Sequence, residues 1–266
     1  MQNFNFPLYL FGIIVLFSTI ACQDVIELDL DTAEPRLVIE GVLDATAGTA
    51  TVTLQRTKGF YESNDIDYLS GASVVLRRED GEAIEIPEVE VGRYILTNQT
   101  YTPGEQYELE ITVEGITYRA TSTIPIPVAL DSLEVNAGPS AGPNAGASIL
   151  NARFVDPQPG TDNFYRIRSQ ENGELLDDVY TLLDDGTTTD IELDVVIFHP
   201  YEAGSLATVT LLSCDFGYYE YFRQLSTLTA NGPNSVTPFN PVGNFGEEVL
   251  GYFGSVQTST RSVVVE

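Results

Sequence analysis

The chain of 266 residues contains one histidine, His199, and two cysteines, Cys22 and Cys214. A thiolate activated by a neighbouring imidazole is the nucleophile of many hydrolases, so Cys214 and His199 are the first pair to consider. Cys214 ends the apolar run ATVTLLSC, and His199 stands before a proline at the end of DIELDVVIFHP. Both settings are typical of structural strand residues, so we expect Cys214 to be a small buried side chain. A Cys–His nucleophilic pair is the alternative.

Cys22 follows the longest apolar segment of the chain, PLYLFGIIVLFSTIA at residues 7–21. This segment is shorter than the roughly 20 residues that a membrane-spanning helix needs. Residues 1–21 resemble a lipoprotein signal peptide, and TIAC (19–22) resembles its lipobox. The resemblance implies cleavage before Cys22 and acylation of its thiol, so we expect Cys22 to be the lipidation site. The alternative is a secretory signal cut after Ala21. With Cys22 acylated, Cys214 has no intramolecular partner and the mature fold has no disulfide.

Acidic side chains are the other candidates for chemistry, because the chain has 39 Asp and Glu against 12 Lys and Arg. Three loops gather them: ESNDID (62–67), DPQPGTD (156–162) and LDDGTTTD (183–190). Calcium prefers such oxygen ligands, but none of the loops has the Asp-x-Asp-x-Asp-Gly order that spaces ligands around one ion. We interpret them as solvated faces and predict no metal site and no cofactor. A hydrolase that uses two carboxylates is the alternative, although no pair stands out.

Composition and motifs narrow the function further. The net charge of −27 repels the phosphate backbone, so binding of nucleic acid is not expected. The sequence has no phosphate-binding glycine loop, no GxSxG nucleophile motif and no histidine cluster. We therefore predict that the protein is not an enzyme and assign it no catalytic or cofactor-binding residue.

The elements that position these residues read mainly as β-strands. In residues 36–127, β-branched runs with period-two alternation are separated by turn residues, which predicts an antiparallel sandwich. The stretch GRYIL…PGEQYELEITVEGITYRA (92–120) resembles the pattern of immunoglobulin-like and transthyretin-like domains, and includes a hairpin turn at Glu114-Gly115. That resemblance implies a core role for Tyr94, Tyr107, Leu109 and Ile111.

The rest of the chain divides around this sandwich. Residues 22–35 form an acidic leader or tether, and 124–149, with four prolines, predict a boundary without regular structure. We expect a second β-rich domain over residues 128–266. It contains one amphipathic helix at about 216–230, with Asp215 as N-cap, and ends in a pair of strands at 249–256 and 260–266.

Two longer motifs resemble one family. The leader DVIELDLDTAEPRLVIEGVL follows the lipidated cysteine directly, and FNPVGNFGEEVLGYFGSVQTSTRSVVV follows the tyrosine-rich helix. Together they are similar to the DUF4249 family of Bacteroidota outer-membrane lipoproteins. The resemblance implies a protein anchored by lipid in the outer membrane, on its periplasmic or surface face. It also implies a TonB-dependent receptor as partner in nutrient binding or uptake, with no known ligand. The alternative is a structural or adhesive surface protein without a small-molecule ligand.

Overall fold

The computed structural model describes residues 34–59, 65–142, 145–176, 181–186, 192–230 and 239–266. The signal peptide (1–21), Cys22 and most of the leader lie outside these residues, as do parts of the loops 62–67 and 183–190. The described chain is mainly β with one helix, α2 (Phe216–Ala230), which confirms the predicted fold class and the predicted helix. In the described part, no helix is both long enough and apolar enough to cross a bilayer.

One long sheet runs through the whole molecule, and we refer to it as the shared sheet. Its strand order is β13-β12-β16-β17-β1-β2-β7-β6, with β14 paired to β12 and β3 paired to β2. Its strands are β1 (Leu37–Asp44), β2 (Thr49–Arg56), β3 (Asp67–Tyr68), β6 (Glu88–Glu90), β7 (Arg93–Leu96), β12 (Phe164–Glu171), β13 (Glu174–Leu175), β14 (Thr181–Asp184), β16 (Leu206–Cys214) and β17 (Leu250–Val264).

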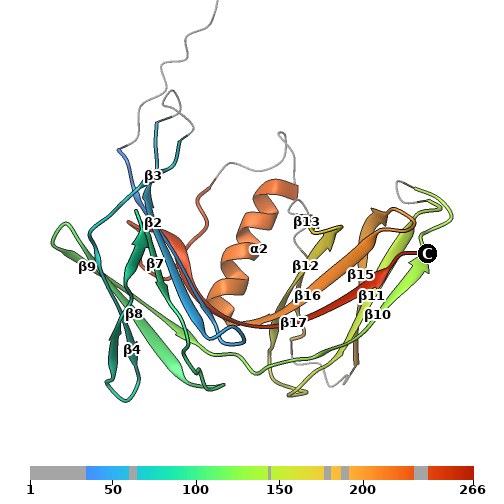
Figure 1. Cartoon of the computed structure of the whole chain (residues 1–266), viewed down its shortest axis with the longest axis horizontal. Coiled ribbons are helices and arrows are strands. Elements are labelled where there is room, and N and C mark those ends of the chain that lie inside the picture. Colours follow the sequence, from blue (N-terminus) through green and yellow to red (C-terminus); the bar gives the residue numbers. More distant parts are fainter. Residues whose placement is uncertain (1–33, 60–64, 143–144, 177–180, 187–191, 231–238) are drawn as a thin grey trace, which may run out of the picture.

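Two smaller sheets cover the outer face of the shared sheet, one on each arm of the molecule (Figure 1). The first has the order β5-β4-β8-β9, and the second has the order β10-β11-β15. Their strands are β4 (Ser73–Arg78), β5 (Ala83–Glu85), β8 (Gln106–Val113), β9 (Ile116–Thr123), β10 (Leu130–Ala137), β11 (Ser148–Val155) and β15 (Glu192–Tyr201).

Alternating side chains build the first sandwich. Every second residue of β8 is buried, and Tyr107, Leu109 and Ile111 join Tyr94 of β7 in a core between the first small sheet and the shared sheet. The predicted core role of these four residues is therefore confirmed. The β8–β9 hairpin turns at Glu114 and Gly115, whose φ angles of 53° and 82° are those of the tight turn that suits the strand twist.

The strand β17 differs from the predicted pair of closing strands, because its 15 residues are continuous. Leu250–Val256 pairs with β1, and Val256–Val264 pairs with β16. The β1–β17 pairing is parallel, so the first sandwich is not wholly antiparallel as predicted. One strand thus belongs to both arms, and its pairing with β1 joins residues more than 200 positions apart.

A glycine makes the parallel pairing possible. Gly251 has a φ of +96°, and a Cβ built on it would lie 1.9 Å from the carbonyl oxygen of Ile39. Only glycine can place its backbone this close to β1 in that conformation.

The second arm holds its own core. Buried residues of β11, β12, β15 and β16 meet there, among them Phe154, Tyr165 and Leu211. The strand β10 lies inside the segment 124–149, which the sequence predicts to lack regular structure. That prediction was wrong because the prolines flank LDSLEVNA without interrupting it, and the strand gains its bonds from the distant β11.

Candidate functional site

The helix α2 lies on the concave face of the shared sheet, in the hollow between the two arms (Figure 1). Adjacent residues of β16 and β17 point to opposite faces, so Leu211 and Phe253 enter the two sandwich cores while Leu212 and Tyr252 contact the helix. The helix begins at Asp215, whose Oδ1 accepts a hydrogen bond of 3.0 Å from the amide of Tyr218. The predicted N-cap is confirmed.

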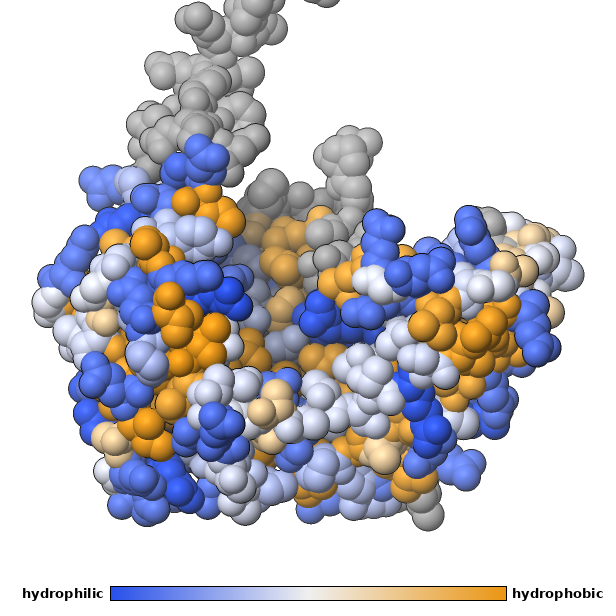
Figure 2. All heavy atoms as spheres, viewed as in Figure 1, coloured by the Kyte–Doolittle hydropathy of each residue, from blue (hydrophilic) through white to orange (hydrophobic). Residues whose placement is uncertain are grey.

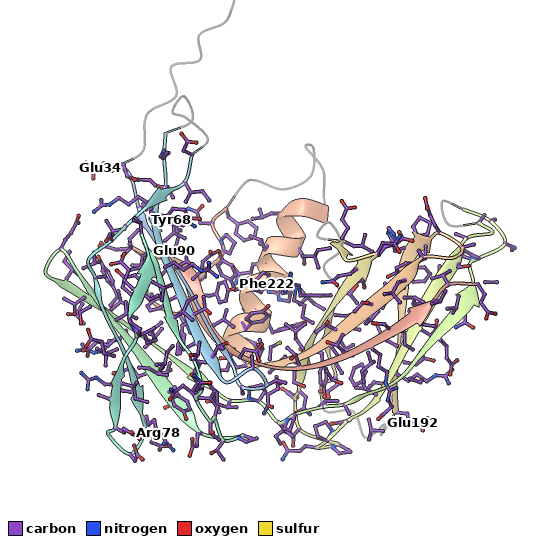
Figure 3. The ribbon with its side chains drawn as sticks, viewed as in Figure 1. Glu34, Tyr68, Arg78, Glu90, Glu192 and Phe222 are labelled. Carbon is purple, nitrogen blue, oxygen red and sulfur yellow. The ribbon has the colours of Figure 1, made fainter. Side chains whose placement is uncertain are left out.

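An aromatic cluster forms where α2 meets the sheet. The ring of Tyr252 lies 4.7 Å from Tyr221, 5.3 Å from Phe222 and 5.5 Å from Tyr218. Phe222 stands in the space between the arms (Figure 3). The apolar stripe of the helix therefore has two roles. It packs against the shared sheet, and part of it also forms a wall of the hollow.

Two arginines of β12 lie beside this cluster. The guanidinium carbon of Arg166 is 3.9 Å from the centre of the Phe222 ring, and its Nη1 donates a 3.0 Å hydrogen bond to the hydroxyl of Tyr218. Such a cation–π contact holds the guanidinium plane in place. Arg168, two residues on and therefore on the same face of the strand, is exposed.

Arg168 differs from most of the other exposed arginines of this acidic chain, which pair with carboxylates. Arg261 is also exposed and outside the ion pairs of the described residues, but it donates to the carbonyl oxygen of Leu130. Arg119 and Arg153 each contact two carboxylates within 4.0 Å. Among the residues that the structure describes, none forms an ion pair with Arg168. The donors of the Arg168 guanidinium are thus not used by an ion pair within the described chain, and guanidinium donors suit carboxylate or phosphate groups.

These residues line a cavity of about 420 Å³. Figure 2 shows the hollow from the side, with apolar side chains on its floor and both polar and apolar side chains on the two arms. The cavity is lined by arginine, amide, hydroxyl and aromatic groups together with one carboxylate, and they include Asp44, Arg166, Arg168, Gln170, Thr210 and Tyr252. Its volume is in the range of small-molecule sites.

A second cavity, of about 500 Å³, lies at the junction of β9, β12 and the start of α2. Its polar wall includes Ser122 and Asp215. The Ser122 hydroxyl donates a 2.7 Å hydrogen bond to Asp215 Oδ2, while Asp215 Oδ1 accepts the Tyr218 amide. Both oxygens of the carboxylate are thus engaged in holding the helix, so we assign this cavity a structural role.

The comparison with protein-family models agrees with the sequence resemblance. The family model described as "Domain of unknown function (DUF4249)" matches residues 23–262. The chain belongs to the DUF4249 family. No curated protein matches it. One similar solved structure is the two fibronectin type-III domain segment from chicken tenascin, at 12% identity and a TM-score of 0.23, covering 67% of this chain and 90% of that one.

The structure separates the two residues of the possible nucleophilic pair in this DUF4249 protein. Cys214 is buried, its Sγ lies 3.4 Å from the carbonyl oxygen of Phe164, and burial raises the pKa of its thiol well above the usual value. His199 Nε2 is 3.3 Å from Glu171, which stands seven residues from Phe164 along β12, or about 23 Å. The alternative of a Cys214–His199 nucleophile is therefore wrong, and Cys214 is the small buried side chain that we expected.

The structure brings parts of two of the three acidic loops together. In the described residues, no three or more His, Cys, Asp or Glu side chains cluster so that they could hold a metal ion. Asp156 and Asp185, from the loops 156–162 and 183–190, nevertheless approach each other through Asn163. Sequence reasoning missed Arg166 and Arg168, although an RxR pair on a strand of so acidic a chain is a signal that could have marked them.

Proposed function

We propose that this DUF4249 protein is a lipid-anchored, non-catalytic accessory protein of the bacterial outer membrane that binds a nutrient-derived ligand and works with a TonB-dependent receptor. The observation that carries the binding role is the hollow beside α2, with the Arg166–Arg168 pair next to a wall of aromatic rings. The family match and the motifs that flank the fold support the cellular role.

The lining of the hollow supports binding rather than bond breaking. Guanidinium groups form paired hydrogen bonds to carboxylates, sulfates or phosphates, and aromatic rings pack against the apolar face of a sugar or an aliphatic chain. A ligand with one acidic group and one apolar face would use Arg168 and Phe222 together. We therefore propose acidic glycans or similar carboxylate-bearing nutrients as the ligand class.

The place where the described chain begins supports a role close to the membrane. Glu34, the first described residue, lies at the top of one arm, on the side toward which the hollow opens (Figure 3). Eleven residues lie between Cys22 and Glu34, and the twelve residue-to-residue steps of this tether reach at most about 40 Å. An anchor at Cys22 would thus keep the open side of the hollow close to the membrane and to a receptor in it, and acyl chains hold such an anchor durably.

Co-purification tests the receptor partnership. The protein, tagged at its C-terminus and expressed at native level, is extracted with mild detergent and captured. We expect a large outer-membrane β-barrel receptor in stoichiometric amount. Capture of the protein alone, under conditions that keep another receptor complex of the same membrane intact, would contradict the partnership.

A pair of arginine variants tests the binding role of the hollow. Arg168→Ala removes the exposed guanidinium of the hollow, and Arg153→Ala removes an exposed guanidinium on the far side of the second arm as the matched control. On single carbon sources that include polygalacturonate, we expect slower growth for the Arg168 variant on an acidic source only. Equal growth of both variants and the wild type on every source would favour the structural or adhesive alternative.

A further inference from the structure

Three strand ends meet at one end of the second sandwich. Asp156 follows β11 directly, Asn163 precedes β12, and Asp185 follows β14. Asn163 joins the two carboxylates, since its backbone amide donates 2.7 Å to Asp185 Oδ1 and its side-chain nitrogen donates 3.2 Å to Asp156 Oδ1. The amide of Gln158 adds a 2.8 Å bond to Asp156 Oδ1. One oxygen of each carboxylate is therefore fixed by amide donors.

The other oxygen of each carboxylate has no partner. Asp156 is only 3% exposed, and its Oδ2 and the Oδ2 of Asp185 are both shielded from solvent without a hydrogen bond in the described chain. The hydroxyl of Tyr165 is a third buried oxygen in the same condition, on a side chain only 1% exposed. Tyr165 pairs with Leu183, two residues before Asp185, and its ring lies 4.9 Å from that of Phe154, two residues before Asp156. Because side chains two residues apart share a face, Tyr165 projects to the same side as both carboxylates. Its pKa is raised by burial and then by the charges of Asp185 and Asp156.

The charge of this cluster is not compensated by the chain itself. No lysine, arginine or histidine of the described residues forms an ion pair with Asp156 or Asp185. Burial raises the pKa of Asp185, with a smaller contribution from the charge of Asp156. A buried carboxylate beside a half-buried one, with no counter-charge among the described residues, is costly, and either a bound cation or a retained proton relieves that cost.

The number of free oxygens favours the cation over a proton. A proton shared between the carboxylates would serve two oxygens and leave the Tyr165 hydroxyl without a partner. The three side chains project to the same face, yet Tyr165 makes no hydrogen bond to either carboxylate. The oxygens that bind one calcium ion likewise face one point without hydrogen bonds among themselves, since each lies about 2.3–2.6 Å from the ion and farther from the other ligands.

We propose that Asp156, Asp185 and the hydroxyl of Tyr165 form a binding site for a hard divalent cation of the calcium class, completed by water. The site is independent of the hollow beside α2 and of the proposed function. With only two carboxylates, its affinity belongs in the range of about 10⁻⁴–10⁻³ M that is typical of extracellular modules. A cation here would fix the ends of β11, β12 and β14 to one another.

Thermal unfolding tests the site. The soluble Cys22→Ala chain is treated with a chelator, dialysed, and heated in CaCl₂, MgCl₂ or NaCl at equal ionic strength. We expect a saturable rise in Tm of about 2–4 °C in calcium at ten times Kd, with a smaller effect of magnesium. The variants Asp156→Asn and Asp185→Asn should fold and lose the rise, while Asp131→Asn, an exposed aspartate on β10, should keep it.

Direct binding supplies the second readout. Terbium replaces calcium in oxygen sites and emits when a nearby tyrosine is excited, so Tyr165 should sensitise it. We expect luminescence that calcium competes away and that falls at least tenfold in Asp156→Asn at the same terbium concentration. Equal Tm values in calcium and NaCl, with terbium emission unchanged in both asparagine variants, would overturn the site. If those variants are instead more stable than the parent without calcium and no form responds to calcium, the carboxylates share a proton.

Discussion

The hydroxyl oxygens of Ser122 and Ser255 lie 2.6 Å apart, although 133 residues separate them in the sequence. Ser122 belongs to β9 of the first small sheet and Ser255 to β17 of the shared sheet. Ser122 also donates to Asp215, the N-cap of α2. These hydrogen bonds connect an outer sheet, the strand common to both arms and the helix. A change at Asp215 should therefore alter the stability of the whole fold.

The first prediction concerns Asp215 and pH. Burial raises the pKa of Asp215 to about 6, against the effect of the hydrogen bonds that it accepts. Because this value exceeds the unfolded one of about 3.9, the folded state binds more protons between these pH values, and stability falls as pH rises through that range. The substitution Asp215→Asn keeps a side-chain oxygen for the cap but removes the group that ionises. We expect the stability of Asp215→Asn relative to wild type to increase between pH 4 and pH 7.

Urea unfolding at several pH values measures this effect. For a partly buried group we expect an increase on the order of 2 kcal/mol in the difference between the two free energies of unfolding. Asp131→Asn serves as the control at an exposed position and should follow the wild-type profile. Parallel profiles for Asp215→Asn and wild type would show that Asp215 is ionised throughout this range.

The second prediction concerns the pairing of β1 with β17. Gly251→Ala places a methyl group against the carbonyl of Ile39 at a positive φ, and we expect a loss of more than about 3 kcal/mol or failure to fold. Gly246 is the matched control, because its φ is +102° but nothing lies within 4 Å of an added Cβ. Its alanine variant should lose only about 1–2 kcal/mol. Similar midpoints of urea unfolding for both variants would contradict the close approach.

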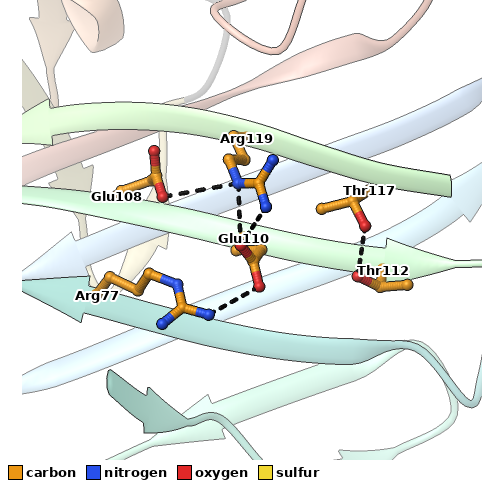
Figure 4. A network of polar contacts seen from close by, with 6 residues as sticks. All are labelled: Arg77, Glu108, Glu110, Thr112, Thr117 and Arg119. Carbon is orange, nitrogen blue, oxygen red and sulfur yellow. Dashed lines mark hydrogen bonds and ion pairs between the residues drawn. The ribbon is translucent and has the colours of Figure 1, made fainter. Parts of the chain in front are cut away.

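The third prediction concerns a charged network on the outer face of the first small sheet (Figure 4). Glu110 accepts hydrogen bonds of 3.0 Å from Arg77 and 2.6 Å from Arg119, which lower its pKa. Its contribution to stability is thus present above the unfolded pKa and is lost as pH falls through the folded one. We expect Glu110→Gln to lower the free energy of unfolding by at most about 1 kcal/mol at pH 7.

Salt and pH distinguish this effect from loss of packing. The difference between Glu110→Gln and wild type should shrink in 1 M salt and vanish in acid below the folded pKa, where both side chains are neutral. Glu108→Gln is the control, because its contact with Arg119 is longer, at 3.8 Å. A deficit that is the same at high salt and in acid would assign the role of Glu110 to packing.

The fourth prediction concerns the anchor. Cys22→Ala should abolish lipid attachment and leave either the uncut precursor or a soluble form, because the thiol is the acylation site that the signal motif implies. The fold should survive, since all the strands and the helix of the described residues lie after residue 34. Detergent-phase partitioning and intact mass decide the matter. A wild-type mass that begins at Cys22 without acyl chains would refute the anchor, and a Cys22–Cys214 disulfide would favour the secreted alternative.

The sequence by itself determined what depends on neighbours in the chain. Alternation in QYELEITV identified the buried face of β8, and the spacing of tyrosines and leucines placed α2 at residues 216–230, because side-chain direction follows the local backbone period. The Glu114-Gly115 turn was also visible, since its backbone conformation depends on those two residues. The resemblance of residues 1–21 to a signal peptide likewise depends only on residues next to one another in the chain.

Only the tertiary structure decided which strands pair and which side chains meet. Nothing near Gly251 in the sequence shows that Ile39 will lie beside it in parallel, and nothing near Asp156 points to Asp185. Period-two alternation gives the buried face of a strand but not its neighbour, because the backbone groups that join strands are the same in every residue. The choice of neighbour depends on how whole faces fit together, so the hollow beside α2 and the carboxylate pair both appear only when the chain has folded.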